Sequence, residues 1–253
     1  MSFVHEDPEF DDLLQLTADS RRISIGIVEK DYWVTHTLWA LHEAGFEVWF
    51  KGGTSLSKGF SLIQRFSEDL DLKLEGGKTG LPGVTNWRSE GVTATRLRRA
   101  YFEELERRIQ VPGATIELEV DRAEQCAWRT GNIRINYPVR HLGTLATVLR
   151  PYVLLEISHA RVTPSVLRDM TSFVHDELEG RNQTAGFKDN RPRSVRCIHP
   201  MVTLLEKLDA IQRRIKRENL EPATFVRHYE DAARIIAAEN ALPPLADYSD
   251  VRA

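Results

Sequence analysis

Residues 50–74, FKGGTSLSKGFSLIQRFSEDLDLKL, combine a glycine pair with two closely spaced aspartates. Gly52 and Gly53 form a turn after an apolar segment, and Thr54 is placed to cap the helix that follows. Farther on, residues 69–75 (DLDLKLE) alternate charged and apolar residues with a period of two, which is the pattern of a strand with one buried face. The stretch therefore predicts a strand–turn–helix–strand unit, with the turn and the second strand at one end of a sheet.

The aspartates and the glycine turn together indicate a site for a nucleoside triphosphate and a metal ion. Asp69 and Asp71 are separated by one residue, so on a strand both side chains leave the same face. The repulsion between two such carboxylates is relieved by a divalent cation such as magnesium, which also binds phosphate oxygens. The glycine turn lets a ligand approach bare backbone, and the helix after it offers free N–H groups. A solvated acid pair beside an ordinary turn is the alternative interpretation.

The rest of the chain alternates predicted strands and helices and then becomes helical. Helices are expected over residues 20–45, 87–109, 200–217 and 222–240, and further strands over 46–50, 114–120, 133–139 and 152–158. The polar, turn-rich residues 179–194 mark the expected domain boundary. We therefore expect an α/β (α+β) fold, in which residues 1–180 form a mixed β-sheet flanked by helices and residues 195–253 form a C-terminal helical bundle.

Composition and charge are those of an ordinary globular protein. The chain has 253 residues, of which 42% are hydrophobic and 28% charged, and its net charge of -3 predicts no global attraction to nucleic acid. Cys126 and Cys197 match no metal-ligand spacing and suit a reducing compartment. The acidic first residues lack the layout of a signal peptide, and no apolar run approaches the roughly 18 to 20 residues of a membrane span. We therefore expect a cytoplasmic protein without a membrane partner.

Several segments together resemble the AbiEii/AbiGii toxin family of nucleotidyltransferases, a branch of the DNA polymerase β-like superfamily. They are KGGTSLSKGF (51–60) with RFSEDLDL (65–72), VEKDYWVTHTL (28–38), LLEIS (154–158), HPMVTLLEKLDAIQRR (199–214) and RHYEDAARI (227–235). The resemblance spans about residues 25–240. Fourteen residues separate Thr54 from Asp69, somewhat more than the ten or so usual in the superfamily, which leaves open whether Thr54 or Ser55 contacts phosphate. Lys30 and Asp31 match the family pattern without an assigned mechanism.

The resemblance implies that Asp69 and Asp71 hold one or two magnesium or manganese ions, which bind the triphosphate. Superfamily members often add a third carboxylate on a neighbouring strand, and Glu156 is our candidate because it interrupts an apolar strand. Burying a carboxylate there is costly without a partner or a metal. Glu117 and Glu119 compete for this role, although their strict alternation fits an exposed strand face better.

The predicted C-terminal helices carry two further matches to the family. Lys207 and Asp231 match a functional lysine and a functional aspartate, with Lys207 placed to reach phosphate charge. The alternative is a structural salt bridge between the two. Lys51, Lys58 and Arg65 flank the glycine turn and could steer a triphosphate, or could be ordinary surface cations.

The resemblance implies metal-dependent transfer of a nucleoside monophosphate from a nucleoside triphosphate (NTP) to an acceptor hydroxyl. Family members are toxins of toxin–antitoxin or phage-defence systems, and some add nucleotides to the 3′ end of tRNA, so tRNA and a cognate antitoxin are the expected partners. The basic clusters at 96–99, 191–196 and 213–217 could neutralise an RNA backbone. The alternatives are transfer to a small molecule or a protein side chain, and a non-catalytic protein that binds nucleotide.

Overall fold

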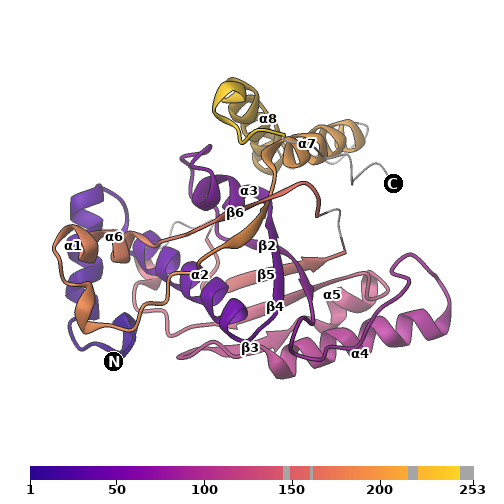
Figure 1. The fold of residues 1–253 in the computed structure, drawn as a ribbon, viewed down its shortest axis with the longest axis horizontal. Coiled ribbons are helices and arrows are strands. Elements are labelled where there is room, and N and C mark those ends of the chain that lie inside the picture. Colours follow the sequence, from indigo (N-terminus) through magenta and orange to yellow (C-terminus); the bar gives the residue numbers. More distant parts are fainter. Residues whose placement is uncertain (145–148, 160–161, 216–221, 246–253) are drawn as a thin grey trace.

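A seven-stranded mixed β-sheet forms the centre of the molecule in the computed structural model, which describes residues 1–144, 149–159, 162–215 and 222–245 (Figure 1). The strand order is β3-β4-β5-β2-β1-β7-β6. The strands are β1 (Glu47–Lys51), β2 (Leu70–Glu75), β3 (Thr115–Leu118), β4 (Thr130–Asn136), β5 (Val153–Ser158), β6 (Ser165–Arg168) and β7 (Val195–Ile198). The predicted α/β class with a mixed sheet and flanking helices is confirmed.

Strand register brings the two halves of the opening sequence stretch to the middle of this sheet. β1 and β2 pair antiparallel, with Lys51 opposite Asp71. β2 pairs parallel with β5, with Asp71 opposite Glu156. Alternate residues of β2, beginning with Leu70, are buried, so the period-two pattern fixes which face carries the acids.

Helices cover the apolar face of the sheet. The helices of five or more residues are α1 (Phe10–Arg21), α2 (Ile25–Glu43), η2 (Ser55–Gly59), α4 (Val92–Arg108), α5 (Val120–Gln125), α6 (Phe173–Gly180), α7 (Pro200–Arg214) and α8 (Pro222–Ala237). α2 is buried along most of its length and contacts β1 and β5. Phe102 of α4 packs directly on Gly131 of β4. A Cβ atom on Gly131 would lie 2.4 Å from the Phe102 ring. α2 and α4 therefore close the main core.

The helix after the glycine turn begins earlier than the sequence predicts. α3 (Gly52–Thr54) runs directly into η2, and Lys51 occupies the N-cap position expected for Thr54. The long helix predicted from residue 20 begins at Ile25, because Arg22 adopts a left-handed conformation that ends α1. None of the helices in the described ranges is both long and apolar enough to cross a membrane.

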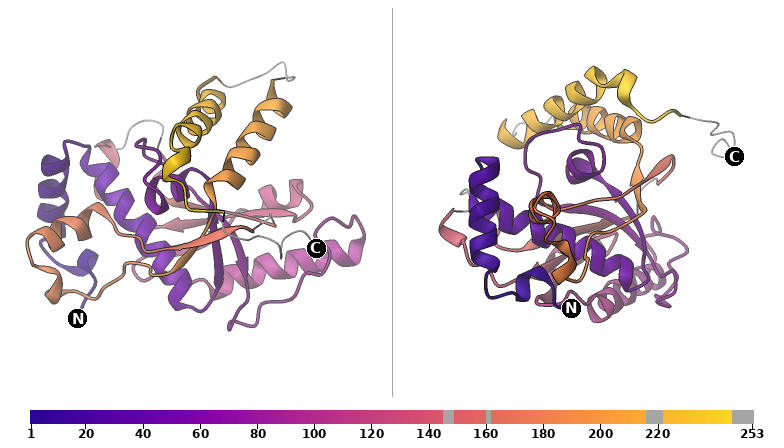
Figure 2. Two further views of the ribbon diagram at one scale, coloured as in Figure 1. Left: turned by 45° about the horizontal axis from the view of Figure 1, so that its top comes forward. Right: turned by 60° about the vertical axis from the view of Figure 1, so that its left-hand side comes forward.

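The C-terminal helices α7 and α8 pack together beyond α3, away from α4 (Figures 1 and 2). A second, smaller apolar cluster joins them to the helix that follows the glycine turn. Its buried members are Leu56, Ile63, Leu204, Ala232 and Ile235. β7 pairs with β1, so residues 195–198 lie in the main sheet and the C-terminal helices begin at Pro200.

Candidate active site

Asp71 and Glu156 form the centre of the candidate active site. They are directly opposite each other on the neighbouring parallel strands β2 and β5. Burial, the charges of Asp71 and Asp69 and a hydrogen bond to Asp71 together raise the pKa of Glu156 to about 7. The structure therefore brings the D-x-D pair and the third predicted carboxylate together.

Asp69 faces a cation of the protein itself. Arg150 Nη1 lies 2.8 Å from Asp69 Oδ1. Burial raises the pKa of Asp69, while the Arg150 charge opposes that shift. Within the described ranges, no three His, Cys, Asp or Glu side chains are arranged so that they could hold a metal ion. The donor chemistry nevertheless fits magnesium or manganese, because both ions prefer carboxylate oxygens and the site contains three carboxylates.

The glycine turn lies directly against these carboxylates. Gly52 has φ +75°, and a Cβ on it would lie 1.8 Å from Asp71 Oδ2. Only glycine fits this approach, because both the backbone conformation and the space exclude a side chain. A Cβ on Gly53 would lie 2.9 Å from Ser67 Oγ and 3.1 Å from an Arg65 nitrogen. The polar segment before β2 therefore lines the turn with a hydroxyl and a guanidinium.

The hydroxyls of Thr54 and Ser55 are both buried, with exposed fractions of 0% and 1%. Thr54 Oγ1 donates to the carbonyl oxygen of Asp69 (2.6 Å) and lies 2.9 Å from Ser67 Oγ. Ser55 Oγ lies near the buried Cys197 thiol. Among the described residues it has no partner at hydrogen-bond geometry. Thr54 thus fastens the helix to the D-x-D strand, and Ser67 is the half-buried hydroxyl nearest to Gly53.

The structure separates the predicted cations around the turn. Lys51 lies opposite Asp71 on β1. Lys58 is nearly buried, with its Nζ 2.6 Å from Asp31 Oδ1 and 3.1 Å from the carbonyl oxygen of Thr171. Lys58 is therefore held in an ion pair with α2 and is not gathered with the carboxylates.

Asp231 joins the C-terminal helices to the turn. Its side chain is completely buried and receives Arg65 Nη2 at 2.8 Å from both carboxylate oxygens. Lys207 Nζ lies 2.8 Å from Asp231 Oδ2. The salt bridge between Lys207 and Asp231, weighed as an alternative from the sequence, is present, and it includes Arg65 as a second cation. Asp231 thus fixes the ends of both cations near the glycine turn.

Sequence reasoning missed Glu206, the residue before Lys207 on α7. Burial raises its pKa, the Lys51 charge lowers it and the Asp71 charge raises it again, which indicates that Glu206 lies close to the carboxylate cluster. Its neighbour Leu205 is exposed, so no periodic signal distinguished Glu206 from an ordinary surface acid. The competitor Glu119 instead lies 2.6 Å from Arg134 and accepts a hydrogen bond from Asn132.

Many arginines of the three basic clusters already have partners. Arg98 is buried and donates to backbone carbonyl oxygens, including that of Ala127. Others form ion pairs: Arg99 with Glu103, Arg191 with Asp189, Arg193 with Asp169 and Arg213 with Asp209. Residues 216 and 217 of the third cluster lie outside the described residues.

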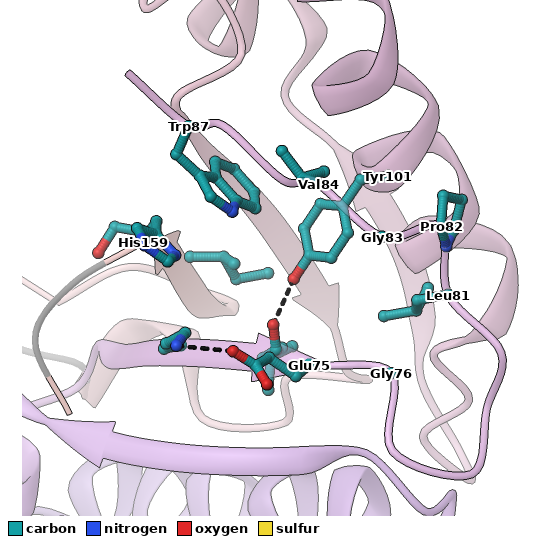
Figure 3. Close-up of a pocket in the computed structure, with 13 residues that line it drawn as sticks. Glu75, Gly76, Leu81, Pro82, Gly83, Val84, Trp87, Tyr101 and His159 are labelled. Carbon is teal, nitrogen blue, oxygen red and sulfur yellow. Dashed lines mark hydrogen bonds and ion pairs between the residues drawn. The ribbon is translucent and has the colours of Figure 1, made fainter. Parts of the chain in front are cut away.

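A cavity of about 320 Å³ lies at the far end of β2 (Figure 3). Its wall includes Glu75, Trp87, Tyr101 and His159. The rings of Trp87 and His159 stack with centroids 5.3 Å apart. The lining begins at Lys73, two residues beyond Asp71 on the same strand, and none of the predicted catalytic residues lines the cavity.

Comparison with known proteins points to one family. A family model described as "Nucleotidyl transferase AbiEii toxin, Type IV TA system" matches residues 39–251. No curated protein matches the sequence. The chain is similar to the solved structure of MenT4, a nucleotidyltransferase toxin from Mycobacterium tuberculosis, with 19% identity and a TM-score of 0.49 over 80% of this chain and 59% of that one. It is also similar to JHP933 from Helicobacter pylori, with 16% identity and a TM-score of 0.44 over 83% of this chain and 66% of that one.

The chain therefore spans roughly three fifths to two thirds of the length of these two structures. Both TM-scores lie below 0.5, so the family assignment depends on the family model alone.

Proposed function

Because the chain belongs to the AbiEii family of nucleotidyltransferase toxins of type IV toxin–antitoxin systems, we propose that it transfers a nucleoside monophosphate from an NTP to an acceptor hydroxyl. The single observation that carries this reaction is the position of Asp71 opposite Glu156 and against Gly52. In the transfer, the acceptor oxygen forms a bond to the α-phosphorus. The bond between that phosphorus and the oxygen bridging to the β-phosphate breaks, and pyrophosphate leaves.

The three carboxylates have distinct parts in this proposal. Asp69 and Asp71 would hold magnesium or manganese, with Glu156 as the third acid beside them. Such an ion, when bound, would neutralise phosphate charge, and it would favour both the attack of the acceptor oxygen and the departure of pyrophosphate. Glu156 lies opposite Asp71 on the neighbouring strand and would accept the proton of the acceptor hydroxyl.

The triphosphate would bind beside the glycine turn, close to α7. The backbone at Gly52 and Gly53 can approach phosphate closely, because neither residue has a side chain. Lys51 and Lys207 would contribute positive charge from β1 and α7. Asp231 pairs with Lys207 at 2.8 Å and would hold this charge in place. Because catalysis of phosphoryl transfer depends mainly on positioning and charge, the reaction needs no covalent enzyme intermediate.

The proposed acceptor is the 3′ end of tRNA in the cytoplasm, and the proposed biological role is that of a toxin paired with a cognate antitoxin. The resemblance of the GGTSLS and RFSEDLD segments to the AbiEii/AbiGii family supports this acceptor. Transfer to a small molecule or a protein side chain is the second candidate. It is favoured by the pairing of several arginines in the basic clusters with neighbouring acids, which reduces the charge free for an RNA backbone.

An acceptor search tests this proposal. The protein is incubated with each of the four α-labelled NTPs, magnesium and total RNA, and label is followed in RNA, protein and small molecules. We expect label in tRNA, and its loss in the variant Asp71→Asn but not in Asp121→Asn, which changes an exposed acid on α5. Label in protein or small molecules alone would exclude tRNA, and transfer by Asp71→Asn at the wild-type rate would exclude this site.

A further inference from the structure

Arg150 brings a guanidinium to the carboxylate site. It lies just ahead of β5, and its Nη1 is 2.8 Å from Asp69 Oδ1. The Arg150 side chain is 41% exposed and that of Asp69 is 30% exposed, so water and solutes reach both groups. The guanidinium therefore partly neutralises Asp69, the first acid of a group that continues with Asp71 and Glu156 on neighbouring strands.

The backbone of Arg150 is held by a lysine from the core. The Lys30 side chain on α2 is 0% exposed, and its Nζ lies 2.6 Å from both Glu68 Oε2 and the carbonyl oxygen of Tyr152. It also donates to the carbonyl oxygen of Arg150. Glu68 Oε2 in turn accepts from the Arg150 N–H at 2.9 Å. All three donors of the lysine are used.

The main chain of Arg150 is held in the core, whereas its side chain is held only by a partly exposed ion pair. Glu68 and Asp69 are adjacent, so Glu68 holds the Arg150 backbone while Asp69 holds its guanidinium. The backbone contacts are made with a buried lysine, whereas the guanidinium contact is partly open to water. The partly exposed ion pair between Arg150 and Asp69 is weak enough to break and re-form, because solvent screens it. The side chain can therefore leave Asp69 without a rearrangement of the sheet.

We propose that Arg150 is a triphosphate-binding residue: a metal-bound triphosphate displaces its guanidinium from Asp69, and the guanidinium then pairs with the triphosphate. This inference rests on the proposed function. A metal ion alone must compete with the guanidinium for an oxygen of Asp69. It also adds positive charge next to the positive charge of Arg150. A triphosphate brings its own negative charge, to which a guanidinium binds well. Metal and nucleotide therefore bind cooperatively, and Arg150 couples them.

Manganese binding, measured calorimetrically, tests the coupling. Without nucleotide, Arg150→Ala should bind manganese about threefold to tenfold more tightly than the wild type, because one partly exposed ion pair no longer competes. With a non-hydrolysable nucleoside triphosphate present, the gain in manganese affinity should be large in the wild type and smaller in Arg150→Ala. Arg150→Lys, which keeps the charge but not the planar fork, should restore part of the wild-type behaviour.

Arg134→Ala is the matched control, because this arginine lies on β4, is 36% exposed and pairs with Glu119. It should bind manganese like the wild type. Equal manganese affinities of the wild type and Arg150→Ala, with and without nucleotide, would overturn the role of Arg150 while leaving the transfer reaction intact. If neither protein binds manganese, and Asp71→Asn transfers nucleotide like the wild type, the carboxylate site itself is wrong and the inference fails with it.

Discussion

Replacing Gly52 by alanine places a methyl group inside the carboxylate site. The added carbon would lie 1.8 Å from Asp71 Oδ2, 2.6 Å from its Cγ and 2.9 Å from its Cβ. Rotation of the carboxylate relieves the first two contacts but not the third, so the start of β2 must also shift. Gly52 has in addition a φ of +75°, which L-residues rarely adopt.

Two penalties add in this variant. The left-handed conformation costs about 1 to 2 kcal/mol, and forcing a methyl group into filled space typically costs about 1 to 3 kcal/mol. We therefore expect the free energy of unfolding to fall by about 2 to 5 kcal/mol. The transfer rate should fall about 100-fold in molecules that remain folded, because a displacement of the reacting groups by about 1 Å has effects of that size.

Urea unfolding and label transfer measure the two effects separately. Gly83→Ala is the control, since a Cβ there meets no atom within 4 Å and the backbone has no positive φ. Gly53→Ala should be intermediate, because its nearest neighbours are the side-chain ends of Ser67 and Arg65, which can move. If Gly52→Ala unfolds and transfers nucleotide like Gly83→Ala, the close approach of the turn to Asp71 is not a feature of the working enzyme.

Three further predictions concern the buried Asp231, the hydroxyl of Thr54 and the buried histidines. Asp231→Asn should lower the free energy of unfolding by about 2 kcal/mol or more and reduce triphosphate affinity, because two partly exposed cations lose their buried partner; unchanged values in urea unfolding and nucleotide titration would contradict this. Thr54→Val should cost about 1 to 3 kcal/mol, because the Asp69 carbonyl loses its hydroxyl donor, and a urea midpoint equal to that of the wild type would refute it. Burial lowers the pKa of His5, His36 and His175 to about 4, 3 and 4, so the unfolded chain binds more protons below pH 6.5 and stability is lost as the pH falls from there toward 4. At pH 5 the loss relative to pH 8 should be about 2 kcal/mol for each histidine, and equal urea midpoints at the two pH values would exclude it.

Local patterns predicted the strands of the site well. The alternation in residues 69–75 predicted β2, and the single acid in an apolar run identified Glu156 as the acid that the sheet places opposite Asp71. Both patterns depend on which face of a strand is buried, which is a property of a few neighbouring residues. Short elements without strong periodicity, such as α6 and β7, were not predicted, because tertiary pairing rather than local preference stabilises them.

The contacts of individual cations could not be read from the sequence. Lys58 looked equivalent to Lys51 beside the glycine turn, yet η2 turns Lys58 toward Asp31. Arg150 carried no signal at all, because its partner Asp69 lies 81 positions away in the chain. Partners of long side chains depend on which segments the fold brings together, and no periodic pattern encodes that.

Two adjacent charges on α2, Lys30 and Asp31, account for a motif that had no mechanism at the level of sequence. Lys30 reaches Glu68 and the backbone before β5, whereas Asp31 reaches Lys58 of η2 and a backbone N–H at the start of α6. Both side chains are almost fully buried, and such pairs often add little net stability because desolvation opposes the attraction. Their consequence is positional. Lys30 fixes the segments that carry the acids, and Asp31 fixes the helix after the glycine turn. Because both side chains project from adjacent positions of α2, this one helix holds the turn and the carboxylates relative to each other.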